Sequence, residues 1–268
     1  MPDLYAQIRE VAPDIQERLA GVLEARAADA RQKEMLKSYF SEIAFPKDAC
    51  VLEIGCGTGA VTRTLASWPG VSKAVGVDPS DSFIAKAREL SKAIPNLSFE
   101  VADGRTLPLD NATFDVVVVH TTLCHVPEPQ KLLAQAHRVL KTGGWLAVFD
   151  GDYATATVAK GESDPLEACI EAFRSGFVHD QWLIRRLPGL MVAAGFTIQP
   201  TRSHGYVEAP EAGYMLTWID RGADVLVQNG RISVETAESL KAEARRRSKV
   251  KEWFGHIAFA SVLARKAA

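Results

Sequence analysis

The hydrophobic pattern of the first 43 residues has the period of a helix. Pro13 followed by Asp14 predicts a break and a restart within this stretch. We predict that the second helix then continues through Phe40 towards Pro46. Apolar side chains recur at the three- and four-residue spacing of one helix face, and they include Leu4, Ile8, Val11, Ile15, Leu19 and Leu23.

From residue 50 onward, short apolar runs alternate with amphipathic segments. Runs that are almost continuous in apolar residues, such as FDVVVV, are typical of strands buried on both faces. Their alternation with helices predicts an α/β fold with a doubly wound, mostly parallel, seven-stranded sheet, which is Rossmann-like. The predicted strands are 50–54, 74–77, 97–102, 114–119, 145–149, 196–199 and 257–264. The predicted helices among them are 61–68, 81–93, 129–140, 164–176, 183–194 and 234–247.

The same pattern predicts three parts of the chain. Residues 1–46 form an N-terminal helical extension, and residues 47–206 together with 256–268 form the α/β domain. Residues 207–255 are mostly helical in pattern and form an insertion before the last strand. Apolar and aromatic residues in and beside the insertion form either an apolar pocket or a stripe that packs on the core; they are Tyr206, Tyr214, Met215 and Trp218.

Composition and charge exclude several classes of protein. The 268 residues are 47% apolar and 24% charged, as in an ordinary globular protein. The net charge of −2 gives no field that would attract nucleic acid or an anionic membrane. No apolar run is long enough to span a bilayer, and the N-terminus does not read as a signal peptide, so we expect a cytoplasmic protein. The basic stretch 241–251 contains acidic residues, which favours a solvated helix face over an RNA site.

The four cysteines predict neither a disulfide framework nor a metal site. They stand at positions 50, 56, 124 and 169 without a C-x-x-C pair. Cys124 and His125 are adjacent, but no further cluster completes a set of metal ligands. We therefore expect no bound metal.

The segment VLEIGCGTG, residues 51–59, carries the strongest chemical signal. A buried strand leads into three glycines at alternate positions and then into a helix, an arrangement that lets the backbone approach a ligand closely. Gly55, Gly57 and Ala60 also fit the loose dinucleotide pattern G-x-G-x-x-G/A. However, the carboxylate of Glu53 beside the loop would repel a pyrophosphate and would suit an ammonium or a sulfonium group.

This segment resembles the first motif of the class I S-adenosylmethionine-dependent methyltransferases. Further segments follow in the order of that family, namely GVDPS, VADG, FDVVVVH and RVLKTGGWLAVFD. The resemblance spans most of residues 50–150 and is greatest to the group of ubiquinone-type and natural-product small-molecule methyltransferases. The chain departs from the family's usual Lys-Pro-Gly-Gly turn at Thr142, which affects the rigidity of the turn more than the chemistry.

The resemblance implies S-adenosyl-L-methionine as cofactor and S-adenosyl-L-homocysteine as product. In the family, the acid that corresponds to Asp78 accepts hydrogen bonds from the ribose, and the acid that corresponds to Asp103 takes the adenine amino group. Either Arg26 or Arg31 could pair with the methionine carboxylate, or each could lie on a solvated helix face. The other predicted cofactor residues are Glu53, Gly55, Cys56, Gly57, Thr58, Gly59, Pro79, Ser80, Ala102, Gly104, His120 and Thr121.

The implied function is methyl transfer to a small-molecule acceptor by in-line displacement. His125 is the candidate general base, with a helix-start or core histidine as the alternative, and His120 is a second catalytic candidate. Asp150, Asp152 and Tyr153 could orient an acceptor. We expect residues 1–46 to act as a lid and residues 207–255 to cover the acceptor pocket. Two other functions stay open: an NAD-dependent oxidoreductase and a non-catalytic cofactor-binding protein. We expect a monomer or a homodimer and no nucleic-acid partner.

Overall fold

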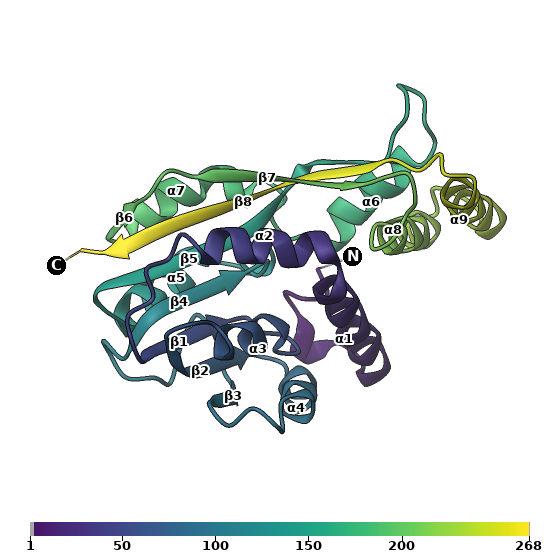
Figure 1. Cartoon of the computed structure of the whole chain (residues 1–268). Coiled ribbons are helices and arrows are strands. Elements are labelled where there is room, and N and C mark those ends of the chain that lie inside the picture. Colours follow the sequence, from purple (N-terminus) through teal and green to yellow (C-terminus); the bar gives the residue numbers. More distant parts are fainter. Residues whose placement is uncertain (1–2, 268) are drawn as a thin grey trace.

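The computed structural model describes residues 3–267 and has a central sheet between layers of helices (Figure 1). The strands are β1 (Ala49–Ile54), β2 (Val71–Asp78), β3 (Leu97–Val101), β4 (Phe114–His120), β5 (Leu140–Thr157), β6 (Phe196–Ile198), β7 (Arg202–Glu208) and β8 (Gly255–Lys266). The helices are α1 (Pro13–Ala28), α2 (Ala30–Phe40), α3 (Ala60–Ala66), α4 (Asp81–Leu90), α5 (Pro129–Val139), α6 (Glu167–Phe177), α7 (Leu183–Ala193), α8 (Leu216–Gln228) and α9 (Val234–Lys249). The structure also has two short 3-10 helices, η1 (Ile8–Glu10) and η2 (Leu123–His125).

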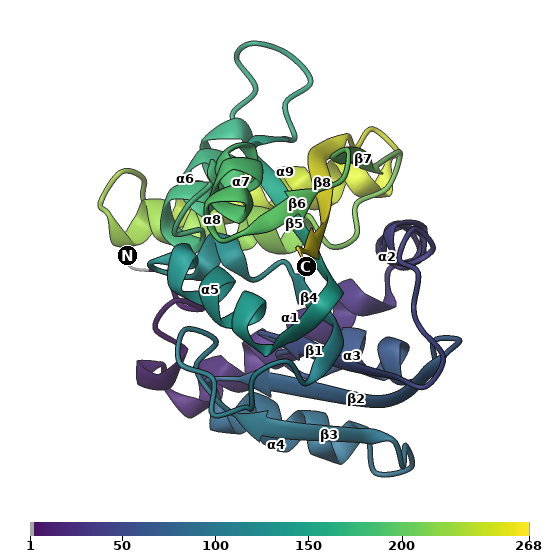
Figure 2. The ribbon, with the colours of Figure 1, turned by 90° about the vertical axis from the view of Figure 1, so that its left-hand side faces the viewer.

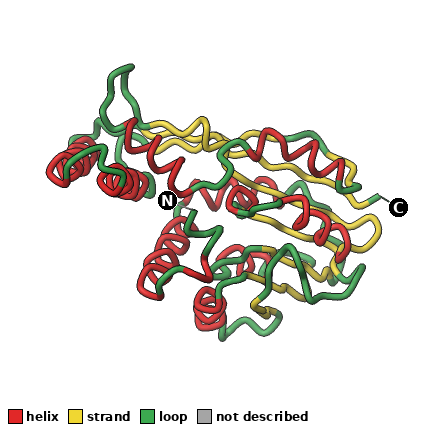
Figure 3. Tube along the Cα trace, turned by 180° about the vertical axis from the view of Figure 1, so that it is seen from behind, coloured by secondary structure: helices red, strands yellow, loops and turns green. Residues whose placement is uncertain are grey.

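The sheet confirms the predicted doubly wound fold. Its strand order is β3-β2-β1-β4-β5-β8-β6. Strands β1 to β5 are parallel to one another, and β8 is antiparallel to β5. The strand order reverses between β1 and β4, which is where α/β sheets hold ligands at the carboxyl ends of their strands. In Figure 2, α5 and α7 lie on one side of the sheet and α2 on the other, and Figure 3 shows the strands running together between these layers.

The sheet has eight strands rather than seven. Residues 202–208, at the boundary of the predicted helical insertion, form β7, which pairs with residues 255–261 of β8. Strand β6 pairs with the other end of β8, at residues 264–266, so β6 and β7 share one edge. Strand β5 also continues eight residues beyond its predicted end at residue 149. The long β8 explains both differences, since it offers backbone partners well beyond the parallel core.

The N-terminal extension contains a helix break that the apolar period does not reveal. Helix α1 ends at Ala28, and the carboxylate of Asp29 accepts hydrogen bonds from the backbone N–H groups of Arg31 and Gln32. Asp29 is thus the N-cap of α2, so the prediction of one helix from Asp14 to Phe40 was wrong. The break separates α1, which packs on α4, from α2, which reaches β7.

Helices α6, α8 and α9 gather near the carboxyl ends of the parallel strands, whereas α7 packs beside β6 (Figure 1). Helices α6 and α8 pack closely, because Gly222 lets α8 approach the carbonyl of Cys169: a β-carbon at position 222 would lie 1.8 Å from that oxygen. The ring of Trp218 stacks on Phe173 at 4.9 Å between centroids. Helix α9 begins at the predicted N-cap Ser233, whose hydroxyl accepts the N–H of Thr236. Within residues 3–267, no helix has the length and apolar character needed to cross a bilayer.

Candidate functional site

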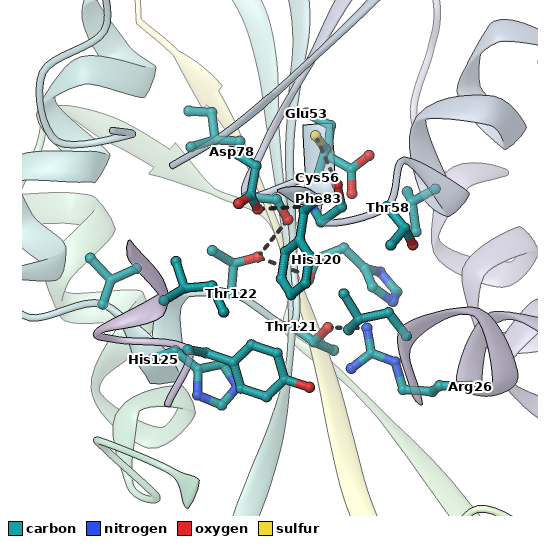
Figure 4. A pocket seen from close by; sticks show the side chains of 18 of the residues that line it. Arg26, Glu53, Cys56, Thr58, Asp78, Phe83, His120, Thr121, Thr122 and His125 are labelled. Carbon is teal, nitrogen blue, oxygen red and sulfur yellow. Dashed lines mark hydrogen bonds between the residues drawn. The ribbon is translucent and has the colours of Figure 1, made fainter. Parts of the chain in front are cut away.

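One cavity of about 460 Å³ opens at the carboxyl ends of β1, β2 and β4 (Figure 4). The β1–α3 loop and the ends of β2 and β4 line one part of it. Residues 5–10, α1, α2, α6 and α8 contribute to the other walls, together with residues of the loops that follow β3, β4 and α6. Most of the predicted site residues therefore meet at one place, although they come from distant parts of the sequence.

The glycine loop after β1 has backbone angles that favour glycine. Gly55, Gly57 and Gly59 have φ values of 77°, 51° and 79°. A β-carbon at Gly55 would lie 2.2 Å from the methyl group of Thr122, whose hydroxyl donates a hydrogen bond to the Gly55 carbonyl. The loop is thereby fixed against the end of β4 at the rim of the cavity.

Asp78 connects the end of β2 to the glycine loop. One carboxylate oxygen accepts the N–H of Gly57 and the other accepts the N–H of Ser80, both at 2.9 Å. A carboxylate offers about four acceptor positions, so about two remain for a ligand. Burial raises the pKa of Asp78 to about 6, while the two N–H groups oppose this rise.

Glu53 lies deeper, beneath the glycine loop. Its carboxyl group accepts the Thr62 hydroxyl at 2.5 Å and is only 2% exposed. Burial raises its pKa to about 8, so in the ligand-free protein it holds a proton at neutral pH. A cation placed beside Glu53 would favour the ionised form.

The neighbouring loop residues are held by the N-terminal helix. Thr58 donates a hydrogen bond to Glu24 of α1 at 2.6 Å, and Arg63 forms two hydrogen bonds with the same carboxylate. Burial raises the pKa of the Cys56 thiol well above its usual range, so this side chain acts as a small apolar group in the cavity wall. Helix α1 is thus attached to the loop that it covers.

The third acid, Asp103, lies at the cavity but is already paired. Arg105 donates to both oxygens of its carboxylate, at 2.7 to 3.3 Å, and this interaction lowers the pKa of Asp103. Gly104 also lines the cavity, whereas Ala102 is buried behind it and is not a lining residue. On the β2 side, Pro79 lines the cavity and its carbonyl accepts a hydrogen bond from Arg9; Ser80 caps α4.

The two candidate arginines have different positions. Arg26 lines the cavity and donates a hydrogen bond to the Thr121 hydroxyl at 2.5 Å. Arg31 is outside the cavity, where it donates to the Val207 carbonyl and lies over the Tyr206 ring. Of the two alternatives, only Arg26 can therefore reach a ligand in this cavity.

His120 and His125 also differ in their surroundings. His120 stacks on Phe149 at 4.7 Å between ring centroids, and its Nδ1 shares a 2.9 Å hydrogen bond with the Tyr39 hydroxyl. Burial, with a smaller effect of Arg26, lowers the pKa of His120 well below its usual range. His120 is therefore a neutral, weakly basic group that shapes the cavity wall.

His125 has a carboxylate partner that the sequence pattern does not reveal. Its Nδ1 lies 2.6 Å from Oδ2 of Asp3, which also accepts the N–H of His179 at 2.8 Å. The side chain of Asp3 is only 2% exposed, and the ring of Tyr5 packs against His125. The position of Asp3, 122 residues away in the sequence, gave no local signal.

The remaining wall of the cavity is largely aromatic. Tyr5, Tyr153, Phe173, Phe177 and Tyr214 line it. Of the residues of the predicted apolar set, only Tyr214 reaches the cavity, and Tyr206, Met215 and Trp218 are buried in the packing around it. Asp150 is fully buried and accepts the N–H groups of Cys124 and Gly151, while Asp152 pairs with Arg185. In the part of the chain that the structure describes, no group of three potential metal ligands is found.

Comparisons with known proteins agree with this geometry. Residues 52–148 match the family model described as a methyltransferase domain. The predicted resemblance of this part of the chain to the class I S-adenosylmethionine-dependent methyltransferases is thereby confirmed. The cofactor of this family is S-adenosylmethionine.

Individual relatives match only part of this chain. The chain is 30% identical to a 27-O-demethylrifamycin SV methyltransferase of Amycolatopsis mediterranei, over 55% of this chain and 48% of the relative. It is 26% identical to a ubiquinone biosynthesis O-methyltransferase of Paraburkholderia phymatum, over 62% of this chain and 76% of the relative. In four other curated relatives, the match covers only 27–43% of the relative's length.

The similarity of the fold extends over more of the chain than the similarity of the sequence. The crystal structure of the YcgJ protein of Bacillus subtilis superposes with a TM-score of 0.62 over 88% of this chain and 99% of that chain, at 17% identity. The comparisons do not favour the NAD-dependent oxidoreductase.

Proposed function

We propose that this chain transfers a methyl group from S-adenosylmethionine to a small-molecule acceptor. The observation that carries the proposal is the single cavity, which joins the glycine loop and Asp78 at one end to His125 and the aromatic wall at the other. Cofactor and acceptor would occupy these two ends. The N-terminal extension and helix α8 would cover them, which is the role predicted for residues 1–46 and 207–255.

The residues at the first end suit the cofactor chemically. Asp78 keeps acceptor positions for a ribose, and Glu53 can gain a negative charge beside a cation. Arg26 would pair with the methionine carboxylate, since no side-chain carboxylate of residues 3–267 lies within 4 Å of its guanidinium. The remaining cofactor residues would be Gly55, Cys56, Gly57, Thr58, Pro79, Asp103, Gly104, His120 and Thr121, all of which line the cavity. Gly59 and Ser80 do not line it and would act by shaping the glycine loop and by holding Asp78. Arg105 would stay paired with Asp103.

When bound, S-adenosylmethionine supplies a methyl group that is already activated for in-line displacement. The chain contributes alignment of the acceptor and exclusion of water from the reacting atoms. Helix α1 serves this purpose, because Glu24 attaches it to the glycine loop through Thr58 and Arg63. The buried side chains of His120 and Tyr39 fix the opposite wall.

His125 would act as general base, oriented by Asp3. In the tautomer that carries its proton on Nδ1, His125 would donate that proton to the carboxylate of Asp3, and Nε2 would be left as the acceptor atom. Nε2 would take the proton from a hydroxyl or an amine of the acceptor as its oxygen or nitrogen gains the methyl group. The dyad thus favours acceptors that lose a proton on methylation.

Isothermal titration and a product assay test the proposal together. We expect S-adenosylhomocysteine to bind with a stoichiometry of one and NAD to give no heat of binding. Binding of NAD alone would establish the oxidoreductase instead. Binding of S-adenosylhomocysteine, with no methylated product from a broad panel of phenols and amines, would favour the non-catalytic cofactor-binding protein.

A further inference from the structure

Arg221 on helix α8 places a positive charge in the aromatic part of the cavity. It lines the cavity, and its guanidinium lies over the Phe177 ring at 5.3 Å from the centroid. The close contact of its neighbour Gly222 with Cys169 fixes the rotation of α8 about its axis at this point. The position of Arg221 is therefore set by helix packing.

No side-chain carboxylate in the described residues 3–267 forms an ion pair with this guanidinium. Within residues 3–267, no Asp or Glu oxygen lies within 4 Å of Arg221. The acids nearest to the aromatic wall are already engaged: Asp3 by His125 and His179, and Asp150 by two backbone N–H groups. By contrast, neighbouring Asp220 on the outer face of α8 pairs with Arg245 at 2.9 Å.

Tyr5 is a polar side chain that faces Arg221. Burial raises the pKa of the Tyr5 hydroxyl, and the charges of Arg221 and Arg26, together with a hydrogen bond from Arg221, oppose this rise, so Tyr5 stays protonated. The phenol therefore keeps its own proton for a ligand oxygen. A planar guanidinium beside a phenol, partly withdrawn from water, matches a carboxylate or phosphate oxygen pair.

We propose that the acceptor carries an anionic group, a carboxylate or a phosphate, which Arg221 binds at the aromatic end of the cavity. This inference rests on the proposed function and defines its substrate class. The anionic group would be held against α8, and the aromatic wall would pack on the body of the acceptor. The group to be methylated would then face the dyad of His125 and Asp3.

Three small probes separate the anionic sources from a neutral control. They are 4-hydroxybenzoate, phenyl phosphate and the neutral 4-hydroxybenzamide, which differs from the first in charge but hardly in shape. Binding is measured by ligand-observed NMR with S-adenosylhomocysteine at saturation. We expect one of the two anions to bind at least about tenfold more tightly than the amide, and the preferred anion identifies the source.

Arg221→Gln should abolish this preference, and Arg221→Lys should retain part of it. Arg231→Gln is the matched control, because Arg231 is exposed beyond the end of α8 and is not a lining residue. Equal binding of all probes to the native chain, including no binding of any, overturns the proposal, as does a preference that survives in Arg221→Gln. S-adenosylhomocysteine is titrated into the same proteins to separate the anionic acceptor from the proposed function. If S-adenosylhomocysteine does not bind to the native chain, the proposed function itself is contradicted.

Discussion

Replacing Asp78 with asparagine tests whether its carboxylate binds the ligand. The two side chains have the same shape, but asparagine has only one acceptor oxygen. The N–H groups of Gly57 and Ser80 point to different oxygens of Asp78. In Asp78→Asn, one of these N–H groups therefore faces the donor side of the amide, and a ligand hydroxyl loses a charged acceptor.

Two effects on the ligand-free protein nearly cancel. Burial shifts the pKa of Asp78 from 3.8 to about 6, so the charged carboxylate costs the folded state about 3 kcal/mol at pH 7. Asparagine removes this cost, and the unsatisfied N–H costs about 1–3 kcal/mol. We expect the melting temperature to change by only a few degrees. The ligand, however, loses a charged hydrogen bond of about 1–3 kcal/mol, which is about 5- to 150-fold in affinity.

Titration of S-adenosylhomocysteine from pH 5 to pH 8 measures this effect. For the native chain, affinity should be constant above pH 7 and should fall as pH drops below about 6, because the carboxyl group becomes protonated. Asp78→Asn should bind weakly and lack this dependence. The exposed Asp81, which is not a lining residue, gives the matched control Asp81→Asn. An unchanged affinity and an unchanged pH profile in Asp78→Asn would refute the reasoning.

Three further predictions concern the base, the loop and the buried acid. His125→Ala should lower turnover about 10²- to 10⁴-fold with little change in the affinity for S-adenosylhomocysteine, and Asp3→Asn should do so to a smaller extent; an equal loss of affinity would argue for a structural role. Gly55→Ala should lower the free energy of unfolding by at least about 2 kcal/mol in a denaturant titration, whereas Gly21→Ala, with open space around it in α1, should be neutral or stabilising. Equal effects of the two substitutions would contradict the close contact between Gly55 and Thr122. The pKa of Glu53 rises to about 8 on folding, so the folded state holds a proton and loses stability as pH rises from about 4.5 to 8. Glu53→Gln should remove this loss and melt at least about 2–4 °C higher than the native chain at pH 9. Identical melting curves of the two proteins at pH 9 would contradict this prediction.

The sequence predicts the parallel half of the fold well because its signals are local. Strands buried on both faces are nearly continuous in apolar residues, and the glycines at 55, 57 and 59 occupy positions with positive φ. The cap at Asp29 escaped prediction because the apolar period continues through it. Strand β7 escaped because its partner, the first half of β8, lies about 50 residues later in the chain.

The candidate site likewise contains residues that local sequence signals predict and residues that only long-range packing brings into place. Glycine-loop residues and Asp78 follow directly from strand ends, so their meeting could be expected from the topology. The contacts of Asp3 with His125, and the position of Arg221 in the cavity, arise from long-range packing of the N-terminal segment and of α8. Arg31 was a candidate cofactor residue, but it lies against β7 and away from the cavity. The sequence pattern could not distinguish it from Arg26.

A crystal structure with S-adenosylhomocysteine would show whether the cavity binds an adenosyl group. We expect the ribose hydroxyls at the free acceptor positions of Asp78, and the thioether sulfur between the glycine loop and the aromatic wall. An adenosyl group bound elsewhere, or a diphosphate against the glycine loop, would contradict this expectation.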